Sequence, residues 1–382
     1  MVATAGETTA HRTGGTNYGV EGAKNYARAK HGPDGSAFLD SVFLPFLRNI
    51  AGKFLIDVGC GAGPWAVFAA DQGAKVFGID FQMDMLKNAK IAISDADVNG
   101  KVFLANADGA ALPAREGEFD QALSINVGCN LPNQSTKHVF EPDLKLEYDK
   151  KVGFESHFEE MARVLKPYGK AIVTAPTSFG EVFTRGTREK KYVLKSIEQQ
   201  LNFINIEISQ IPPTLSERER KIQEDTIIKN HLNKLDDVYR ATFASRDGKW
   251  VLITDEGKLK SGEKIWRKLP GLTVPNNYHH EDEYIAAAKK AGFRVVEQHH
   301  KLFRTEKERR KYNASVSTDK HLGKEYSEEA GGKPPFVVYV FEKLLPPLDP
   351  RIRIIGQVTD SESAADIAEA TVHALAKQAG GQ

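Results

Sequence analysis

The stretch that decides the fold is FLIDVGCGAGPWA, residues 54 to 66. The apolar run at its start predicts a short buried strand, and Pro64 predicts the first turn of a helix. Three glycines at alternate positions join the two. A glycine-rich turn of this kind lets a ligand approach the backbone closely at the N-terminus of the helix.

The spacing of these glycines restricts the ligand. Gly59, Gly61 and Gly63 form the pattern G-x-G-x-G. Dinucleotide-binding folds use G-x-G-x-x-G, and a P-loop needs Gly-Lys-Ser/Thr at its end. Neither pattern is present, so the loop predicts a different ligand.

Further strands and helices alternate along the chain. Apolar strand patterns lie at 74–80, 101–108, 119–126 and 169–176, and two more follow at 293–300 and 334–344. Helical patterns separate most of them, for example at 81–98, 154–169 and 280–292. Alternating strands and helices predict an α/β fold whose parallel sheet is covered on both faces.

Three acidic residues end three successive strands. Asp57 ends the first strand, Asp80 ends VFGID and Asp108 ends LANAD. In an open α/β sheet these strand ends border the ligand crevice, so the three carboxylates are expected to face one ligand. Asp80 suits a ribose diol, and the absence of an adjacent Arg argues against a 2′-phosphate.

In these motifs the sequence resembles the class I S-adenosylmethionine-dependent methyltransferases, from about residue 54 to 176 and more loosely to 343. LIDVGCGAG, VFGID, NADGAALP and FDQALSIN resemble that family's first four motifs, and HFEEMARVLKPYGKAIVTAP resembles the helix and strand that follow. The resemblance implies a three-layer Rossmann-like sandwich. Its seven-stranded sheet is mostly parallel with an antiparallel last strand, and S-adenosyl-L-methionine is the expected cofactor.

The resemblance also implies roles for individual residues. The backbone around the three glycines is expected to hold the amino-acid part of the cofactor, with Asp57 orienting the loop and attracting the amino group. Asp80 is expected to bind the ribose and Asp108 the adenine amino group. The remaining expected cofactor contacts are Phe81 on the adenine, Gly109 and Ala110 along the ring, Asn126 at the methionine part, and Tyr26, with Tyr18, in a closing arm.

Composition limits the class of protein only loosely. Hydrophobic residues make up 41% and charged residues 27% of the 382 residues, and the net charge is +1, so nothing attracts nucleic acid or membrane globally. Two cysteines allow neither a disulfide framework nor a four-thiolate zinc site. The polar start and the absence of a long apolar run lead us to expect a soluble, cytoplasmic protein without a secretory signal.

The expected domain organisation has three parts. Residues 1–34 form an N-terminal arm or lid, 35–344 the methyltransferase domain, and 345–382 a tail with an Ala-rich helix. The domain contains a cap insertion at 177–275 and a basic loop at 302–334. Within the cap we expect a polar helix at 215–239 and a hairpin at 249–269 that turns at residues 255–257.

The sequence does not identify a catalytic base. His138 and His157 are candidates, although a lone histidine is more often structural. The tripeptide Asn130-Leu131-Pro132 lacks the following aromatic that an adenine-amine methyltransferase needs, so CNLPN is interpreted as a turn. HHEDE at 279–283 is interpreted as a helix start, because adjacent histidines diverge by about 100°, and no metal site is expected.

The favoured function is transfer of a methyl group to a small-molecule acceptor under the cap. An alternative is an RNA methyltransferase that contacts phosphates through the basic loop at 301–324. A third is a binding subunit that keeps the fold without the activity. Nucleic acid is the less favoured partner, and the acceptor atom and the oligomeric state stay open.

Overall fold

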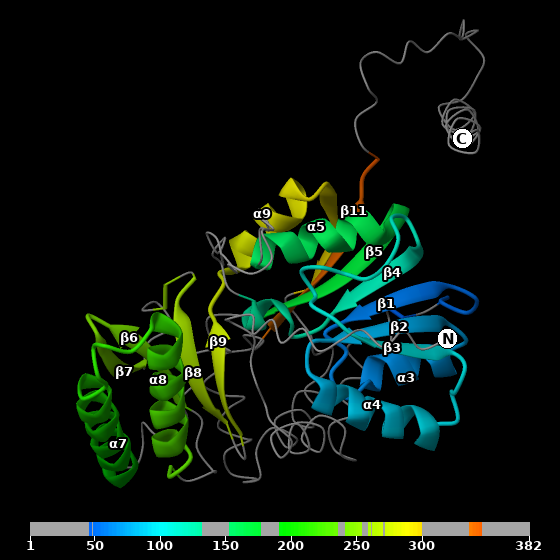
Figure 1. The fold of residues 1–382 in the computed structure, drawn as a ribbon. Helices are drawn as coiled ribbons and strands as arrows, with labels where there is room; N and C mark the ends of the chain where they lie inside the picture. The colour runs from blue at the N-terminus through cyan, green and yellow to red at the C-terminus, as the bar shows by residue number, and fades with distance from the viewer. Residues whose placement is uncertain are drawn as a thin grey trace, which may run out of the picture. The chain divides into compact units, whose positions relative to one another are not determined.

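The computed structural model describes residues 46–47, 49–131, 153–176, 191–235, 241–253, 259–260, 262–269, 272–299 and 336–345 (Figure 1). The predictions for the arm at 1–34 with Tyr18 and Tyr26, for His138, for the basic loop at 302–334 and for the C-terminal helix lie outside these residues. The cap insertion is described from residue 191 onward, with gaps.

Seven strands form the main sheet, in the order β10-β11-β5-β4-β1-β2-β3. Strands β1 to β5 pair in parallel, whereas β11 is antiparallel to both β5 and β10. The predicted mostly parallel sheet with an antiparallel last strand is therefore confirmed. The strands are β1 (Phe54–Val58), β2 (Lys75–Asp80), β3 (Val102–Asn106), β4 (Phe119–Ser124), β5 (Leu165–Pro176), β10 (Phe293–His299) and β11 (Phe336–Lys343).

Helices cover both faces of this sheet. Helices α3 (Pro64–Asp71) and α4 (Met83–Asp95) lie on one face, and α5 (Phe154–Val164) and α9 (Glu281–Lys290) lie on the other (Figure 1). The alternation of side chains along β1 explains the two cores. Leu55 packs with Ala66 of α3, while Ile56 packs with Phe158 of α5. This is the predicted three-layer sandwich.

The insertion has its own sheet and helices. Helices α7 (Lys191–Ser209) and α8 (Glu217–Leu232) precede an antiparallel sheet in the order β7-β6-β8-β9. Its strands are β6 (Ala241–Arg246), β7 (Lys249–Ile253), β8 (Lys264–Leu269) and β9 (Leu272–Asn277). Phe243, Trp250 and Trp266 pack against the two helices and give the insertion a core of its own.

One prediction for the insertion is confirmed and one is wrong. The polar helix predicted at 215–239 is α8. The hairpin predicted at 249–269 is wrong, because β6 lies between β7 and β8 and pairs with both. The tight turn instead joins β6 to β7 at Asp247 and Gly248, whose φ angles of 48° and 74° are those of a two-residue hairpin turn.

Candidate cofactor site

The glycine loop leaves β1 in a left-handed conformation. Gly59, Gly61 and Gly63 have φ angles of 70°, 55° and 81°, which side chains rarely adopt. A Cβ atom at Gly59 would lie 2.5 Å from Cγ2 of Val127, so that space is already filled. At Gly61 a Cβ would meet nothing within 4 Å. The loop is therefore supported at Gly59 and open at Gly61.

Asp80 at the end of β2 holds this loop. Its Oδ2 accepts a hydrogen bond from the Gly61 N–H at 2.9 Å, and its Oδ1 accepts one from the Gln82 N–H at 2.8 Å. Burial raises the pKa of Asp80, and these two bonds oppose the rise. The loop-orienting role that the resemblance assigns to Asp57 thus falls, in part, to Asp80. Each carboxylate oxygen keeps a second lone pair, so binding of ribose stays a prediction.

Asp57 is a buried carboxylate beside the same loop. It is 1% exposed, and its Oδ2 has no hydrogen-bond partner in the structure. Burial, followed by the charge of Asp80, raises its pKa to about 7, and a hydrogen bond from the backbone of Ala66 opposes this. An acceptor buried in this way calls for a donor. A cationic amino group fits this need, so the residues present fit the expected cofactor.

Phe81 and Asp108 lie at the ends of β2 and β3. The Phe81 side chain is 47% exposed, so it is not part of the core. Its carbonyl accepts from Nδ2 of Asn106 at 2.8 Å, a contact that the sequence did not indicate. Asp108 is half-buried, and its Oδ1 accepts from the Ala110 N–H at 2.8 Å. This bond shapes the turn that carries Gly109.

His157 connects two strand ends and is not placed as a base. It is completely buried on α5, and its Nδ1 lies 3.0 Å from the Gly109 carbonyl. Because a carbonyl only accepts, Nδ1 carries the proton, and Nε2 accepts from the Ser124 hydroxyl at 2.8 Å. Burial lowers the pKa of His157, which keeps the ring neutral. The structural interpretation of this histidine is therefore the one the geometry supports.

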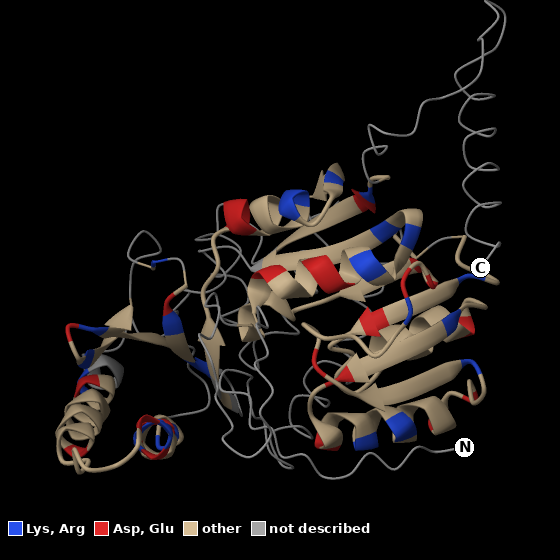
Figure 2. Cartoon of the chain, turned by 45° about the horizontal axis from the view of Figure 1, so that its top comes forward, with Lys and Arg blue, Asp and Glu red and all other residues tan. Residues whose placement is uncertain are grey.

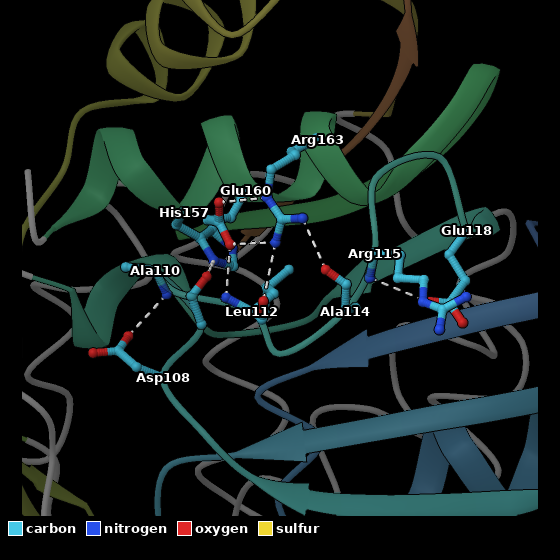
Figure 3. Close-up of polar contacts among 10 residues, drawn as sticks. Asp108, Ala110, Leu112, Ala114, Arg115, Glu118, His157, Glu160 and Arg163 are labelled. Atoms are coloured by element: carbon cyan, nitrogen blue, oxygen red, sulfur yellow. Dashed lines mark hydrogen bonds and ion pairs between the residues drawn. The ribbon is translucent and has the colours of Figure 1, made fainter. Parts of the chain in front are cut away.

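A second contact from α5 fixes the segment after Asp108 (Figure 3). Glu160 accepts from the Leu112 N–H at 2.7 Å. Arg163 donates to the carbonyls of Ala114 and Leu112 at 2.8 and 3.0 Å and also pairs with Glu160. Sequence reasoning missed both residues. Their only signal is the i, i+3 spacing of opposite charges on one helix.

Asn126 follows β4 in a left-handed conformation, with φ of 59°. Its N–H donates to Oγ1 of Thr174 at 2.7 Å, and its carbonyl accepts from Nδ2 of Asn130 at 3.0 Å. A short 3-10 helix, η1 (Gly128–Asn130), comes next. The interpretation of CNLPN as a turn agrees with this helix over the described residues 129–131.

The two adjacent histidines at the start of α9 serve different purposes. His280 is the N-cap and forms a capping box with Glu283, which confirms the predicted helix start. His279 is fully buried, stacks on Phe154 at 4.0 Å between ring centroids, and donates from Nε2 to the Leu131 carbonyl at 2.7 Å. Across the described ranges, no group of three or more His, Cys, Asp or Glu could hold a metal.

Comparison with known proteins matches part of this chain to a family. Residues 55–169 match the sequence model described as a methyltransferase domain. The demethylmenaquinone methyltransferase of Oceanobacillus iheyensis is 32% identical over 136 residues, 34% of this chain and 48% of that protein. A probable fatty acid methyltransferase of Pseudomonas putida is 40% identical over 82 residues, 21% of each chain.

Relatives that act on RNA also match. The 18S rRNA (guanine-N(7))-methyltransferase bud23 of Schizosaccharomyces pombe is 29% identical over 98 residues, 23% of this chain and 35% of that protein. A solved S-adenosylmethionine-dependent methyltransferase from Mesorhizobium loti aligns with 80% of this chain and 100% of its own, at 16% identity. The TM-score of this alignment is 0.43.

The fold and the loop define a Rossmann-like domain of the methyltransferase type. The chain contains a class I S-adenosylmethionine-dependent methyltransferase domain, and S-adenosylmethionine is the cofactor of that family. The chain spans half or less of the length of the three curated relatives named above. Their substrates therefore remain properties of those proteins.

Proposed function

We propose that this chain is an S-adenosylmethionine-dependent methyltransferase that acts on a small-molecule acceptor. The observation that carries the proposal is the glycine loop, whose backbone is open at Gly61 and flanked by two acceptors, Asp57 and Asp80. Asp57 would face the amino group of the cofactor, and Asp80 would bind its ribose. These donors and acceptors match the two ends of an amino-acid nucleoside.

The adenine end would be held by the next two strand ends. Asp108 would accept from the adenine amino group, with Gly109 along the ring and the exposed Phe81 packed on it. Asn126 would meet the methionine part from the end of β4. S-adenosylmethionine would supply an electrophilic methyl group for in-line transfer to the acceptor, with S-adenosylhomocysteine as the other product. The chain's part is to orient the reactants and exclude water.

The insertion supports the choice of a small acceptor. The predicted insertion, residues 177–275, follows β5, and the last strand of its sheet, β9, extends to Asn277 and contacts the segment after β4. We propose that they form a cap over the acceptor. Demethylmenaquinone and fatty acid methyltransferases among the relatives have small-molecule acceptors by name. His157 is engaged at both ring nitrogens, so the general base, if the acceptor needs one, stays unassigned.

RNA is the second candidate acceptor, because two 18S rRNA (guanine-N(7))-methyltransferases are among the relatives. The basic loop at 301–324 that would contact phosphates lies outside the described residues. On the helices that the structure describes, acidic and basic residues are interspersed (Figure 2). Such a mixed surface offers RNA no continuous basic face there.

Two measurements test the proposal in sequence. Calorimetry should show binding of S-adenosylmethionine and of S-adenosylhomocysteine, and absence of both would overturn it. Incubation with methyl-labelled cofactor and a cell extract, split into metabolites and RNA, should then label the metabolite fraction. Label in RNA alone, with binding that weakens between about 50 and 200 mM salt, would select the RNA alternative. No labelled product in either fraction would leave only a binding subunit.

A further inference from the structure

A chain of side-chain amides connects the insertion to the end of β4. Asn276 on β9 donates from Nδ2 to Oδ1 of Asn130 at 3.0 Å and makes a longer contact to the Cys129 carbonyl at 3.4 Å. Asn130 in turn donates from its own Nδ2 to the carbonyl of Asn126 at 3.0 Å. We call these three residues, Asn276, Asn130 and Asn126, the amide relay. These two hydrogen bonds orient the Asn130 amide, because its Oδ1 accepts one and its Nδ2 donates the other.

The relay holds a residue in the left-handed conformation. Asn126 has φ of 59°, a conformation that Asn adopts more readily than most residues and that its hydrogen bonds fix here. Asn130 and Thr174 supply hydrogen bonds to its carbonyl and its N–H. Asn276 itself is 5% exposed, so its amide depends on these contacts for its hydrogen bonds. The conformation at Asn126 therefore depends on a residue of the insertion.

Two further contacts fix the same segment from the side of β9 and α9. His279 donates to the carbonyl of Leu131 at 2.7 Å. Gly128 lies against the ring of Tyr284, since a Cβ there would come within 2.5 Å of the hydroxyl oxygen. Residues 128–131 are thus contacted by Asn276 of β9, by His279 and by Tyr284 of α9.

The other side of this segment supports the glycine loop. Val127 fills the space next to Gly59, with Cγ2 only 2.5 Å from where a Cβ would stand. A displacement of residues 126–131 would therefore move the support of the loop and Asn126 together. Both belong to the cofactor site of the proposed function.

We infer that Asn276 is a positioning residue of the cofactor site, acting through Asn130 on Asn126. The inference rests on the proposed function. The insertion would then do more than enclose the acceptor, because it would also set the affinity for the cofactor. Coupling between two sites is reciprocal, so the bound cofactor must stabilise the contact between β9 and residues 128–131.

The test is calorimetry with S-adenosylhomocysteine on Asn276→Ala, Asn130→Ala and the double variant. We expect Asn276→Ala to raise the Kd for S-adenosylhomocysteine about tenfold, because the arrangement of residues 126–131 that binds it is then populated in only a minority of the molecules. If the relay runs through Asn130, the double variant should bind no more weakly than Asn130→Ala alone.

Asn205→Ala is the matched control. Asn205 bonds the backbone of Trp250 twice within the insertion, at 2.8 and 3.1 Å, and contacts no residue of the relay by these bonds. It should destabilise the insertion with less than a twofold change in Kd. An equal loss of affinity in Asn205→Ala would overturn the inference, and so would unchanged affinity in Asn276→Ala beside normal binding by the wild type.

Hydrogen exchange of the wild type keeps the inference testable if the variants unfold. Bound S-adenosylhomocysteine should slow amide exchange in residues 128–131 and 272–277 and leave 249–253 unchanged. Protection of the glycine loop without protection of 272–277 would overturn the inference and leave the proposed function standing. A wild type that binds no S-adenosylhomocysteine would overturn both.

Discussion

Replacing Asp57 by asparagine should raise stability and weaken cofactor binding at the same time. The side chain is 1% exposed, Oδ2 has no hydrogen-bond partner, and the pKa is raised from 3.8 to about 7. At one pKa unit per 1.36 kcal/mol, ionised Asp57 costs the folded chain about 4 kcal/mol. Asparagine has nearly the same shape and can keep the bond from Ala66. It removes the charge, and its amide lies near the carboxylate of Asp80.

Only part of this cost is recovered, because a buried amide hydrogen needs an acceptor of its own. We expect a gain of about 2 kcal/mol at pH 8, seen as a rise of about 4 °C in the thermal midpoint. The folded pKa lies above the unfolded one, so between pH 3.8 and about 7 the folded chain binds more protons at Asp57. The cost of burying ionised Asp57 in the wild type is thus full above about pH 7 and absent below the unfolded pKa. The stability gained by Asp57→Asn should therefore shrink as the pH falls.

The cofactor should respond in the opposite direction. An ionised Asp57 attracts the amino group of S-adenosylmethionine, so wild-type affinity should rise with pH up to about 7 and then level off. The Asp57→Asn variant should bind the cofactor about tenfold to a hundredfold more weakly at pH 8, the loss of one charged hydrogen bond, and its pH profile should be flatter.

Thermal melts and calorimetry at pH 6, 7 and 8 check both halves of the prediction. Asp71→Asn is the control, since Asp71 is an exposed aspartate at the end of α3 and should change neither quantity. A lower melting midpoint for Asp57→Asn at pH 8 would refute the assignment of a buried, uncompensated charge. Unchanged affinity would refute the contact with the amino group.

Three other substitutions test the parts of the site separately. Asp80→Ala removes the acceptor for the Gly61 N–H and should abolish binding detectable by calorimetry while circular dichroism stays native. The control is Asp84→Ala, which removes a half-buried carboxylate paired with Lys87 on the first turn of α4 and should bind normally; retained binding in Asp80→Ala would refute the ribose assignment. Gly59→Ala should lower the thermal midpoint more than Gly61→Ala, because only Gly59 adds a clash at 2.5 Å to the cost of positive φ, and equal losses would contradict this. Arg163→Ala should lower the free energy of unfolding in urea by about 2 kcal/mol, because two backbone carbonyls lose a donor, and a loss below about 0.5 kcal/mol would show that water replaces it.

The main sheet was predictable because its signals are local. The apolar run at 54–58, the glycines and Pro64 lie within one short stretch, and each acts on its own neighbourhood. The sheet of the insertion was not predictable, because the order in which its strands pair depends on contacts between segments far apart in the sequence. The hairpin at 249–269 failed for this reason, although Asp247-Gly248 is a turn signal that could have placed the hairpin correctly.

The site divides in the same way. The positions of the three aspartates near strand ends could be predicted from the sequence, because the topology of a parallel sheet brings strand ends together, and their roles toward the cofactor stay predictions. The hydrogen bonds of these aspartates could not be predicted. In the structure the carboxylate of Asp80 accepts from the Gly61 N–H. Asn276 and Asn130 of the amide relay are 146 residues apart, and His157 is 33 residues from Ser124. No period or motif connects residues at such separations, so only the folded chain shows them.

One buried carboxylate distinguishes the edge of the sheet where β1 ends. The Oδ2 atom of Asp57 has no hydrogen-bond partner in the structure, and the three left-handed glycines follow directly after it. Left-handed backbone alone does not mark this edge, because Asn49, Tyr168 and Asp247 also have positive φ angles. A buried carboxylate is tolerated where surrounding contacts or a ligand offset the cost of its desolvation, so Asp57 is the feature that argues for a cationic ligand here. Asn276 supports the neighbouring strand end from outside the main sheet, through its hydrogen bond to Asn130.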